Sequence, residues 1–110
     1  MVLRGLGQCQ FTRANETWGF DGRALWSTAF AATWEQGQDW PTLAIGTYTD
    51  VTQDAFPWGS CTPNALYRPK GQGFAAPLDL KPSFCSLSML FTDWNRSGRP
   101  ALRVSNDREY

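Results

Sequence analysis

The sequence predicts an all-β fold made of short strands separated by turns. Three observations predict it: aromatic residues are abundant, glycine and proline recur along the chain, and the helical period is nearly absent. The 110 residues include six Trp, seven Phe and three Tyr, together with ten Gly and seven Pro. Aromatic side chains favour strands, and Gly and Pro mark the turns between them.

The predicted strands follow one another in chain order. Residues 22–33 contain alanines that favour a helix, but their Thr, Phe and Trp and the turn that follows favour a strand. Residues 42–48 alternate, with Leu43 and Ile45 on one face. The remaining segments are 64–68 and 73–78, which flank a turn at 69–72 and so predict a hairpin, then 83–91 and 101–105.

Charge and composition exclude several classes of function. Ten basic and ten acidic residues give a formal net charge of zero, and neither sign runs in a block. Nothing therefore indicates binding to nucleic acid or to an anionic membrane. No apolar stretch approaches the roughly 18–20 residues of a membrane span. The chain has no histidine, which excludes a Ser-His-Asp or Cys-His nucleophile pair and disfavours a catalytic zinc site.

Two parts of the chain resemble each other. A Trp-turn-Pro-strand pattern recurs, with Trp34 and Trp94 separated by 60 residues. The separation is 59 for three further pairs, which indicates one residue lost in the turn: Pro41 and Pro100, Leu43 and Leu102, Ile45 and Val104. A fixed period of this size indicates a solenoid or propeller, in which each repeat is one supersecondary unit. Two independent domains that share the pattern are the alternative.

Specific motifs within these repeats resemble a known family. Residues 64–67 (Asn-Ala-Leu-Tyr) and 71–74 (Gly-Gln-Gly-Phe) resemble the hairpin of FG-GAP or VCBS-type repeats, and residues 91–107 resemble the adjoining strand, calcium loop and strand. The chain is most similar to FG-GAP proteins that carry an ASPIC-type domain and are related to cartilage acidic proteins. This resemblance implies a non-catalytic, seven-bladed β-propeller with cations bound between the first two strands of a blade.

We therefore expect a β-propeller fragment of about one and a half to two four-stranded blades. Residues 1–23 would end a preceding blade or connect to the next one, residues 24–80 would form one blade, and residues 81–110 would form the first half of another. One and a half blades leave open sheet edges and apolar faces. The expected partners are therefore the other blades of a longer chain, in which Trp34 and Trp94 would be structural residues between blades.

The loop at residues 93–98 is the predicted cation site. Asp93, Asn95 and Ser97 hold positions one, three and five of the loop, and Gly98 at position six permits a sharp turn. Calcium takes six to eight oxygen ligands, which alternate residues of a tight loop can supply. Position nine, which supplies another carboxylate in the full motif, is Ala101, so binding is expected to be weak. The alternative is that Asp93 and Asn95 cap a β-turn through their own backbone.

Three cysteines leave one without a partner. A disulfide between Cys61 and Cys85 would close a loop of about 24 residues and stabilise the fold by roughly 3 kcal/mol. Such a bond suits an oxidising compartment. The alternative is a pair of small buried thiols. Cys9 has no evident partner in the sequence.

Two classes of function remain. The first is a non-catalytic extracellular or periplasmic binding or adhesion scaffold, whose ligand would be an unidentified protein or carbohydrate. Its secretion signal would lie upstream, because residues 1–7 lack an apolar core. The second is a carbohydrate-active enzyme or lectin-like module with a Trp-lined surface. Its candidate acids are Glu35 with Asp39 and Asp50 with Asp54, all in polar, turn-rich stretches, so the scaffold is preferred.

Overall fold

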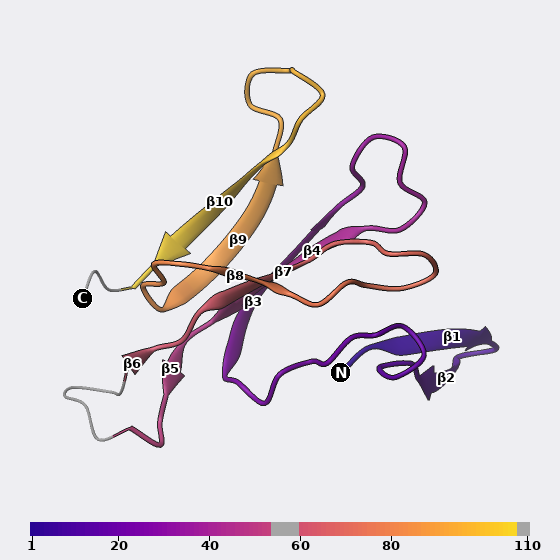
Figure 1. The fold of residues 1–110 in the computed structure, drawn as a ribbon, viewed down its shortest axis with the longest axis horizontal. Coiled ribbons are helices and arrows are strands. Elements are labelled where there is room, and N and C mark those ends of the chain that lie inside the picture. Colours follow the sequence, from indigo (N-terminus) through magenta and orange to yellow (C-terminus); the bar gives the residue numbers. More distant parts are fainter. Residues whose placement is uncertain (54–59, 108–110) are drawn as a thin grey trace.

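The computed structural model describes residues 1–53 and 60–107. All of its regular elements are antiparallel β-strands, and the all-β prediction is confirmed (Figure 1). In these residues no helix is long and apolar enough to cross a membrane. The strands are β1 (Leu3–Gly7), β2 (Gln10–Arg13), β3 (Ser27–Thr33), β4 (Thr42–Thr47), β5 (Thr49–Asp50), β6 (Ser60–Cys61), β7 (Asn64–Tyr67), β8 (Leu78–Leu80), β9 (Ser86–Thr92) and β10 (Ala101–Asn106).

The centre of the molecule is a four-stranded antiparallel sheet in the order β3-β4-β7-β8. Strands adjacent in this sheet follow one another along the chain, apart from the short β5–β6 ribbon inserted between β4 and β7. The last strand begins later than the sequence predicts, at Leu78 rather than residue 73. Before it, Phe74 makes an isolated bridge to Pro69 and donates its backbone N–H to the carbonyl of Trp18. The N-terminal segment therefore bonds to residue 74 on the side away from Pro69, while the Ala75 N–H still donates to the Arg68 carbonyl across the hairpin.

Strands β9 and β10 form a hairpin that repeats the register of β3 and β4. Each of the six cross-strand pairs in β3–β4 has a counterpart 59 residues later in β9–β10, as Phe30–Ile45 corresponds to Met89–Val104. The irregularities also coincide, because each register shift falls next to the first pair of the hairpin, Ser27–Thr47 or Ser86–Asn106. The two hairpins are therefore two copies of one structural unit.

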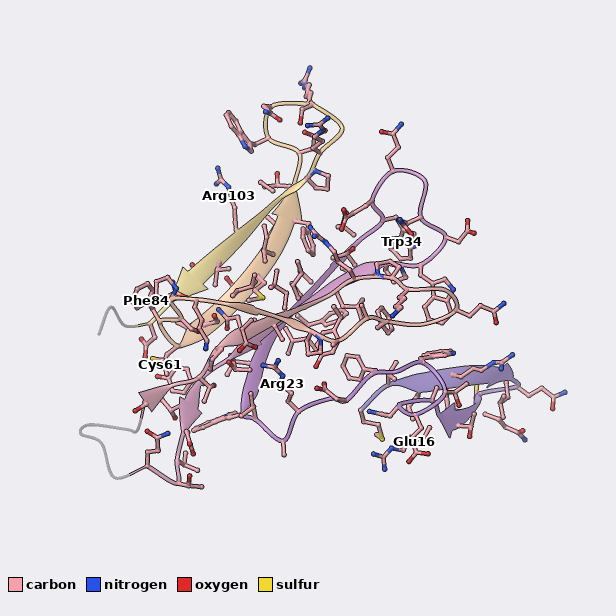
Figure 2. All side chains as sticks on the ribbon, in the orientation of Figure 1. Glu16, Arg23, Trp34, Cys61, Phe84 and Arg103 are labelled. Atoms are coloured by element: carbon pink, nitrogen blue, oxygen red, sulfur yellow. A yellow bond between two sulfur atoms is a disulfide. The ribbon has the colours of Figure 1, made fainter. Side chains whose placement is uncertain are left out.

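The loops of the two hairpins differ although their strands match. The strand pairs flanking both loops keep the same offset, so no residue is lost in the turn and that expectation is wrong. In this register Trp34 corresponds to Asp93 and not to Trp94. Trp34 is 61% exposed and Trp94 is 69% exposed. Neither tryptophan packs between the two sheets described here, and a role against other blades stays a prediction (Figure 2 labels Trp34 on its loop).

The β9–β10 hairpin packs on one face of the four-stranded sheet, here named face B, which carries Ala44 and Leu66. Met89 is buried against both of them. Gly46 makes this approach close, because a Cβ there would lie 2.8 Å from the Cβ of Ala29 and 3.0 Å from that of Ser86. Small residues at the centre of face B thus allow the second hairpin to pack directly on the sheet.

The opposite face, face A, carries Phe30, Leu43, Ile45, Ala65 and Tyr67. The segment that precedes β3 covers part of it. Within this core the ring of Phe20 lies 4.6 Å from that of Tyr67 and 6.1 Å from that of Phe74, centroid to centroid. The sheet therefore has two apolar faces, one packed on the second hairpin and one partly covered by the N-terminal segment.

Candidate functional site

A disulfide joins the β5–β6 ribbon to the second hairpin. It links Cys61, at the end of β6, to Cys85, directly before β9, and the Cys85 side chain is fully buried. Figure 2 labels Cys61 near Phe84, at the end of the molecule where β9 begins. The pair is the one that the sequence predicts. The third cysteine, Cys9, is exposed and free at the tip of the β1–β2 hairpin.

The loop between β9 and β10 is organised around the carboxylate of Asp93. Its Oδ1 accepts the backbone N–H of Ser97 at 2.8 Å, and its Oδ2 accepts the backbone N–H of Gly98 at 2.8 Å. The Ser97 hydroxyl lies 3.3 Å from the same Oδ1. Arg96 and Gly98 have positive φ, which tightens the loop around the carboxylate. Both Asp93 oxygens therefore point back into their own loop and cap it.

In this conformation the loop offers a cation few free oxygen ligands, because both Asp93 oxygens already accept backbone N–H groups. Of the predicted ligands, Asp93 and Ser97 contact each other, whereas the exposed Asn95 side chain makes no hydrogen bond within residues 1–53 and 60–107. Those residues contain no cluster of three or more His, Cys, Asp or Glu side chains suited to a metal. The arrangement is that of a capped turn, and weak calcium binding at Asp93, Asn95 and Ser97 stays a prediction.

An apolar groove lies on face A. Its volume is about 750 Å³. Phe30 at its edge is 61% exposed, and the aromatic residues Trp18, Trp40 and Phe74 close one side. Its lining includes Leu25, Phe30, Leu43 and Ile45. A large exposed apolar surface of this kind marks a place where another structure packs.

The second hairpin shows how the residues equivalent to those of the groove pack in the other copy of the repeat. Three groove residues, Phe30, Leu43 and Ile45, correspond in register to residues of the second hairpin. Those counterparts pack on face B of the central sheet: Met89, Leu102 and Val104. The same positions are thus covered by a sheet in one copy of the hairpin and open in the other.

A polar network fastens the N-terminal segment beside the groove. The Tyr67 hydroxyl donates to Asp21, and Arg23 pairs with Asp79 at 2.6 Å between Nη1 and Oδ1. Burial, reinforced by the hydrogen bond to Asp21, raises the pKa of Tyr67 above its ordinary value. The hydrogen bond from Arg23 lowers the pKa of Asp79. These groups hold residues 21–23 against β7 and β8, and Figure 2 labels Arg23 below the sheet.

The acids considered for catalysis are engaged in ordinary contacts. Glu35 accepts a hydrogen bond from Thr42 at 2.6 Å and pairs with Arg68 at 3.4 Å. A hydrogen bond from the Thr52 side chain lowers the pKa of Asp50, whereas a general acid at neutral pH needs a raised one. Asp54, the proposed partner of Asp50, lies outside the described residues.

The tryptophans are distributed over separate regions. Trp18 and Trp40 pack edge to face at 5.1 Å inside the face A core, and Trp26 lies against Tyr48 at 5.4 Å. Trp34 and Trp94 lie on two different loops, and Trp58 is outside the described residues. The described tryptophans therefore form no common platform for a sugar ring.

Comparison of the chain with protein-family models, with curated proteins and with solved structures finds no match. The sequence predicted the disulfide and open apolar faces, but not which residues line the groove on face A. The sequence feature that points to the groove is the alternation of Leu43 and Ile45, which share a face. Phe30, on the neighbouring strand, lies in residues 22–33, where the sequence pattern only favours a strand over a helix. Locating the groove also needed the cross-strand register, since it decides which residues share a face.

Proposed function

We propose that this chain is a non-catalytic extracellular binding scaffold, built from four-stranded sheets that stack face to face as blades of a β-propeller. The observation that carries the proposal is the repeated hairpin. Strands β9 and β10 copy the register of β3 and β4, and they pack on face B of the preceding sheet. A structure that adds one such unit after another is a propeller or solenoid.

The groove on face A supports the same proposal. If the packing of the second hairpin is the rule for each repeat, Phe30, Leu43 and Ile45 of the first hairpin belong against face B of a preceding blade. That blade would need small residues where this sheet has Ala44 and Gly46. Partners of the chain are then other blades of the same kind, and the ligand, a protein or a carbohydrate, would bind the assembled structure.

Two further features favour a scaffold over an enzyme. The chain has no histidine, and the described carboxyl groups with shifted pKa values, Asp50 and Asp79, are shifted downwards by hydrogen bonds. A general acid at neutral pH needs a raised pKa, which neither group has. The Cys61–Cys85 disulfide supports an extracellular or periplasmic location.

The proposal is tested by changing one residue on face A and one outside it. Phe30 and Trp34 are both 61% exposed and both aromatic, but only Phe30 lines the groove. Sedimentation equilibrium of the full chain should reveal self-association through the open apolar face. Phe30→Asp should weaken that association by at least about tenfold, since it places a charge on a surface that must lose water.

Trp34→Asp is the matched control and should leave the association constant unchanged. Equal weakening by both substitutions would mean that general surface hydrophobicity, and not face A, drives association. A wild-type chain that stays monomeric at high concentration would contradict the stacking surface itself.

A further inference from the structure

Two tripeptides in the chain match the acceptor pattern for N-linked glycosylation. They are Asn15-Glu16-Thr17 and Asn95-Arg96-Ser97. The pattern is Asn-x-Ser/Thr with x other than proline, and it acts in surface loops of secreted proteins. The pattern alone does not distinguish the two asparagines. Their structural environments do.

Asn95 is open to modification. It lies in the loop between β9 and β10, which projects beyond the ends of both strands (Figure 1). Its side chain is exposed and makes no hydrogen bond in the described part of the chain. The loop is held instead by Asp93, which binds the backbone of Ser97 and Gly98. A sugar on Asn95 would therefore extend into solvent without removing a contact.

Asn15 is closed to the same modification. It is only 6% exposed, and its Oδ1 accepts the backbone N–H of Val2 at 3.0 Å. Its Nδ2 donates to the carbonyl of Phe20 at 3.0 Å. Nδ2 is the atom that would carry the sugar, so a glycan there would have to pass through the packed turn at residues 15–20. A folded molecule cannot carry it.

We propose that Asn95 is an N-glycosylation site and that Asn15 is not, an inference that rests on the extracellular location proposed above. In the reaction, Nδ2 of Asn95 bonds to the anomeric carbon of a lipid-pyrophosphate-linked oligosaccharide. The bond from that carbon to the phosphate oxygen breaks, the lipid pyrophosphate leaves with the electron pair, and the amide loses one proton to the transferase. The Ser97 hydroxyl, two residues on, completes the recognised tripeptide.

This site is compatible with stacked sheets. The sheets pack through their faces, as Met89 does on Ala44 and Leu66. Asn95 lies beyond the strand ends, so a glycan at this loop would not enter the packed face. It would shield the exposed loop and the neighbouring Trp94, which is 69% exposed.

The test is secretion of the full chain, behind a cleavable signal peptide, from eukaryotic cells. The secreted molecules with an oxidised Cys61–Cys85 disulfide are treated with an amidase that releases N-glycans and converts the carrier Asn to Asp, and the converted residue is located by peptide mass mapping. We expect conversion at Asn95 and none at Asn15. The gel-mobility shift should disappear in Asn95→Gln and Ser97→Ala and persist in Ser97→Thr.

Thr17→Ala is the matched control, because it removes the other tripeptide without altering the hydrogen bonds of Asn15, and it should leave the shift unchanged. A folded, disulfide-bonded secreted chain without a glycan at Asn95 would overturn this proposal and leave the scaffold untouched. A shift that survives Asn95→Gln and disappears in Thr17→Ala would overturn it as well. Failure of the scaffold would appear separately, in the sedimentation of the unglycosylated chain.

Discussion

The side-chain oxygen of Asn64 joins the central sheet to Ser86 at the start of the second hairpin. Oδ1 of Asn64, on β7, accepts the Ser86 hydroxyl at 2.8 Å and the backbone N–H of Thr47, on β4, at 2.9 Å. All three residues are buried. One amide oxygen thus connects β4, β7 and β9, and it fixes where the second hairpin begins on face B.

Removing that oxygen should destabilise the protein strongly. Asn64→Ala eliminates both hydrogen bonds and leaves the buried Thr47 amide without its acceptor, so we expect a loss of about 2–4 kcal/mol in the free energy of unfolding. Ser86→Ala removes the hydroxyl that donates to Asn64 and lies 3.5 Å from Oδ1 of Asn106, but it leaves the Thr47 amide paired, so it should cost about 1 kcal/mol. Urea denaturation measures both. Equal, small losses would mean that the packing of the hairpin does not depend on this junction.

Truncating Met89 tests the packing of the hairpin on face B. Met89 is buried against Ala44 and Leu66, whereas its neighbour Leu90 points outwards and is 59% exposed. We expect Met89→Ala to reduce the free energy of unfolding by about 2–3 kcal/mol. Leu90→Ala should change it by less than about 0.5 kcal/mol. If the two variants unfold at the same urea concentration, the hairpin does not rest on the sheet as described.

Local patterns in the sequence accounted for most of the strands. Alternation of Leu43 and Ile45 placed β4, and the 59-residue offset anticipated the register that β3–β4 and β9–β10 share. The start of β8 could not be predicted, because the register shifts between the Leu66–Leu78 pair and the isolated Pro69–Phe74 bridge, and Pro77 has no backbone N–H for the ladder.

The candidate sites were predictable to different degrees. The spacing of Cys61 and Cys85 and the turn residues around Asp93 are local features, and the sequence located both. Matching Trp34 with Trp94 led to the wrong prediction of a lost residue in the turn, because the two share a residue type but not a register position. Open apolar faces were expected from an incomplete set of blades, but the residues that line the groove on face A depend on the cross-strand register and on which elements cover the sheet.

The disulfide should stabilise the protein mainly through the loop that it closes. Cys61 and Cys85 are 24 residues apart, so a Cys61→Ala, Cys85→Ala double variant should lose about 3 kcal/mol. Alanine is used because a serine at the fully buried position 85 would add the cost of an unpaired hydroxyl. Cys9→Ser is the control and should unfold like the wild type, since Cys9 is exposed and free. Urea and thermal unfolding measure these differences. A double variant as stable as the wild type would contradict the role given to the disulfide.

Alkaline pH should weaken the fold through Tyr67. Burial and the hydrogen bond to Asp21 raise the pKa of Tyr67 above the ordinary value of 10.0. Above about pH 10 the unfolded chain releases the phenol proton while the folded chain keeps it, so the unfolded state binds fewer protons and stability falls as pH rises. Urea midpoints from pH 8 to 11 should fall more steeply for the wild type than for Tyr67→Phe. If the urea midpoints of the wild type and Tyr67→Phe fall equally with pH, ionisation of Tyr67 does not destabilise the fold.

The Asp93 carboxylate has two candidate roles in the loop between β9 and β10, as the cap of a turn and as a calcium ligand. Its oxygens accept the backbone N–H groups of Ser97 and Gly98, so Asp93→Ala should cost about 1 kcal/mol by leaving both donors to water. Asp39→Ala, in the corresponding loop between β3 and β4, is the control. Because Asp39 is exposed and makes no such bonds in the described residues, this variant should unfold like the wild type.

Calcium binding to the same loop should be weak. A cation would compete with the two N–H groups for the single carboxylate, and the loop has Ala101 where another acid would stand. We therefore expect a dissociation constant of about 10⁻³ M, as in low-affinity extracellular modules. Calorimetric titration of the full chain should detect this binding, Asp93→Ala should abolish it, and Asp39→Ala should retain it. If the wild type gives no heat at millimolar calcium, the Asp93 carboxylate acts only as the cap of the turn.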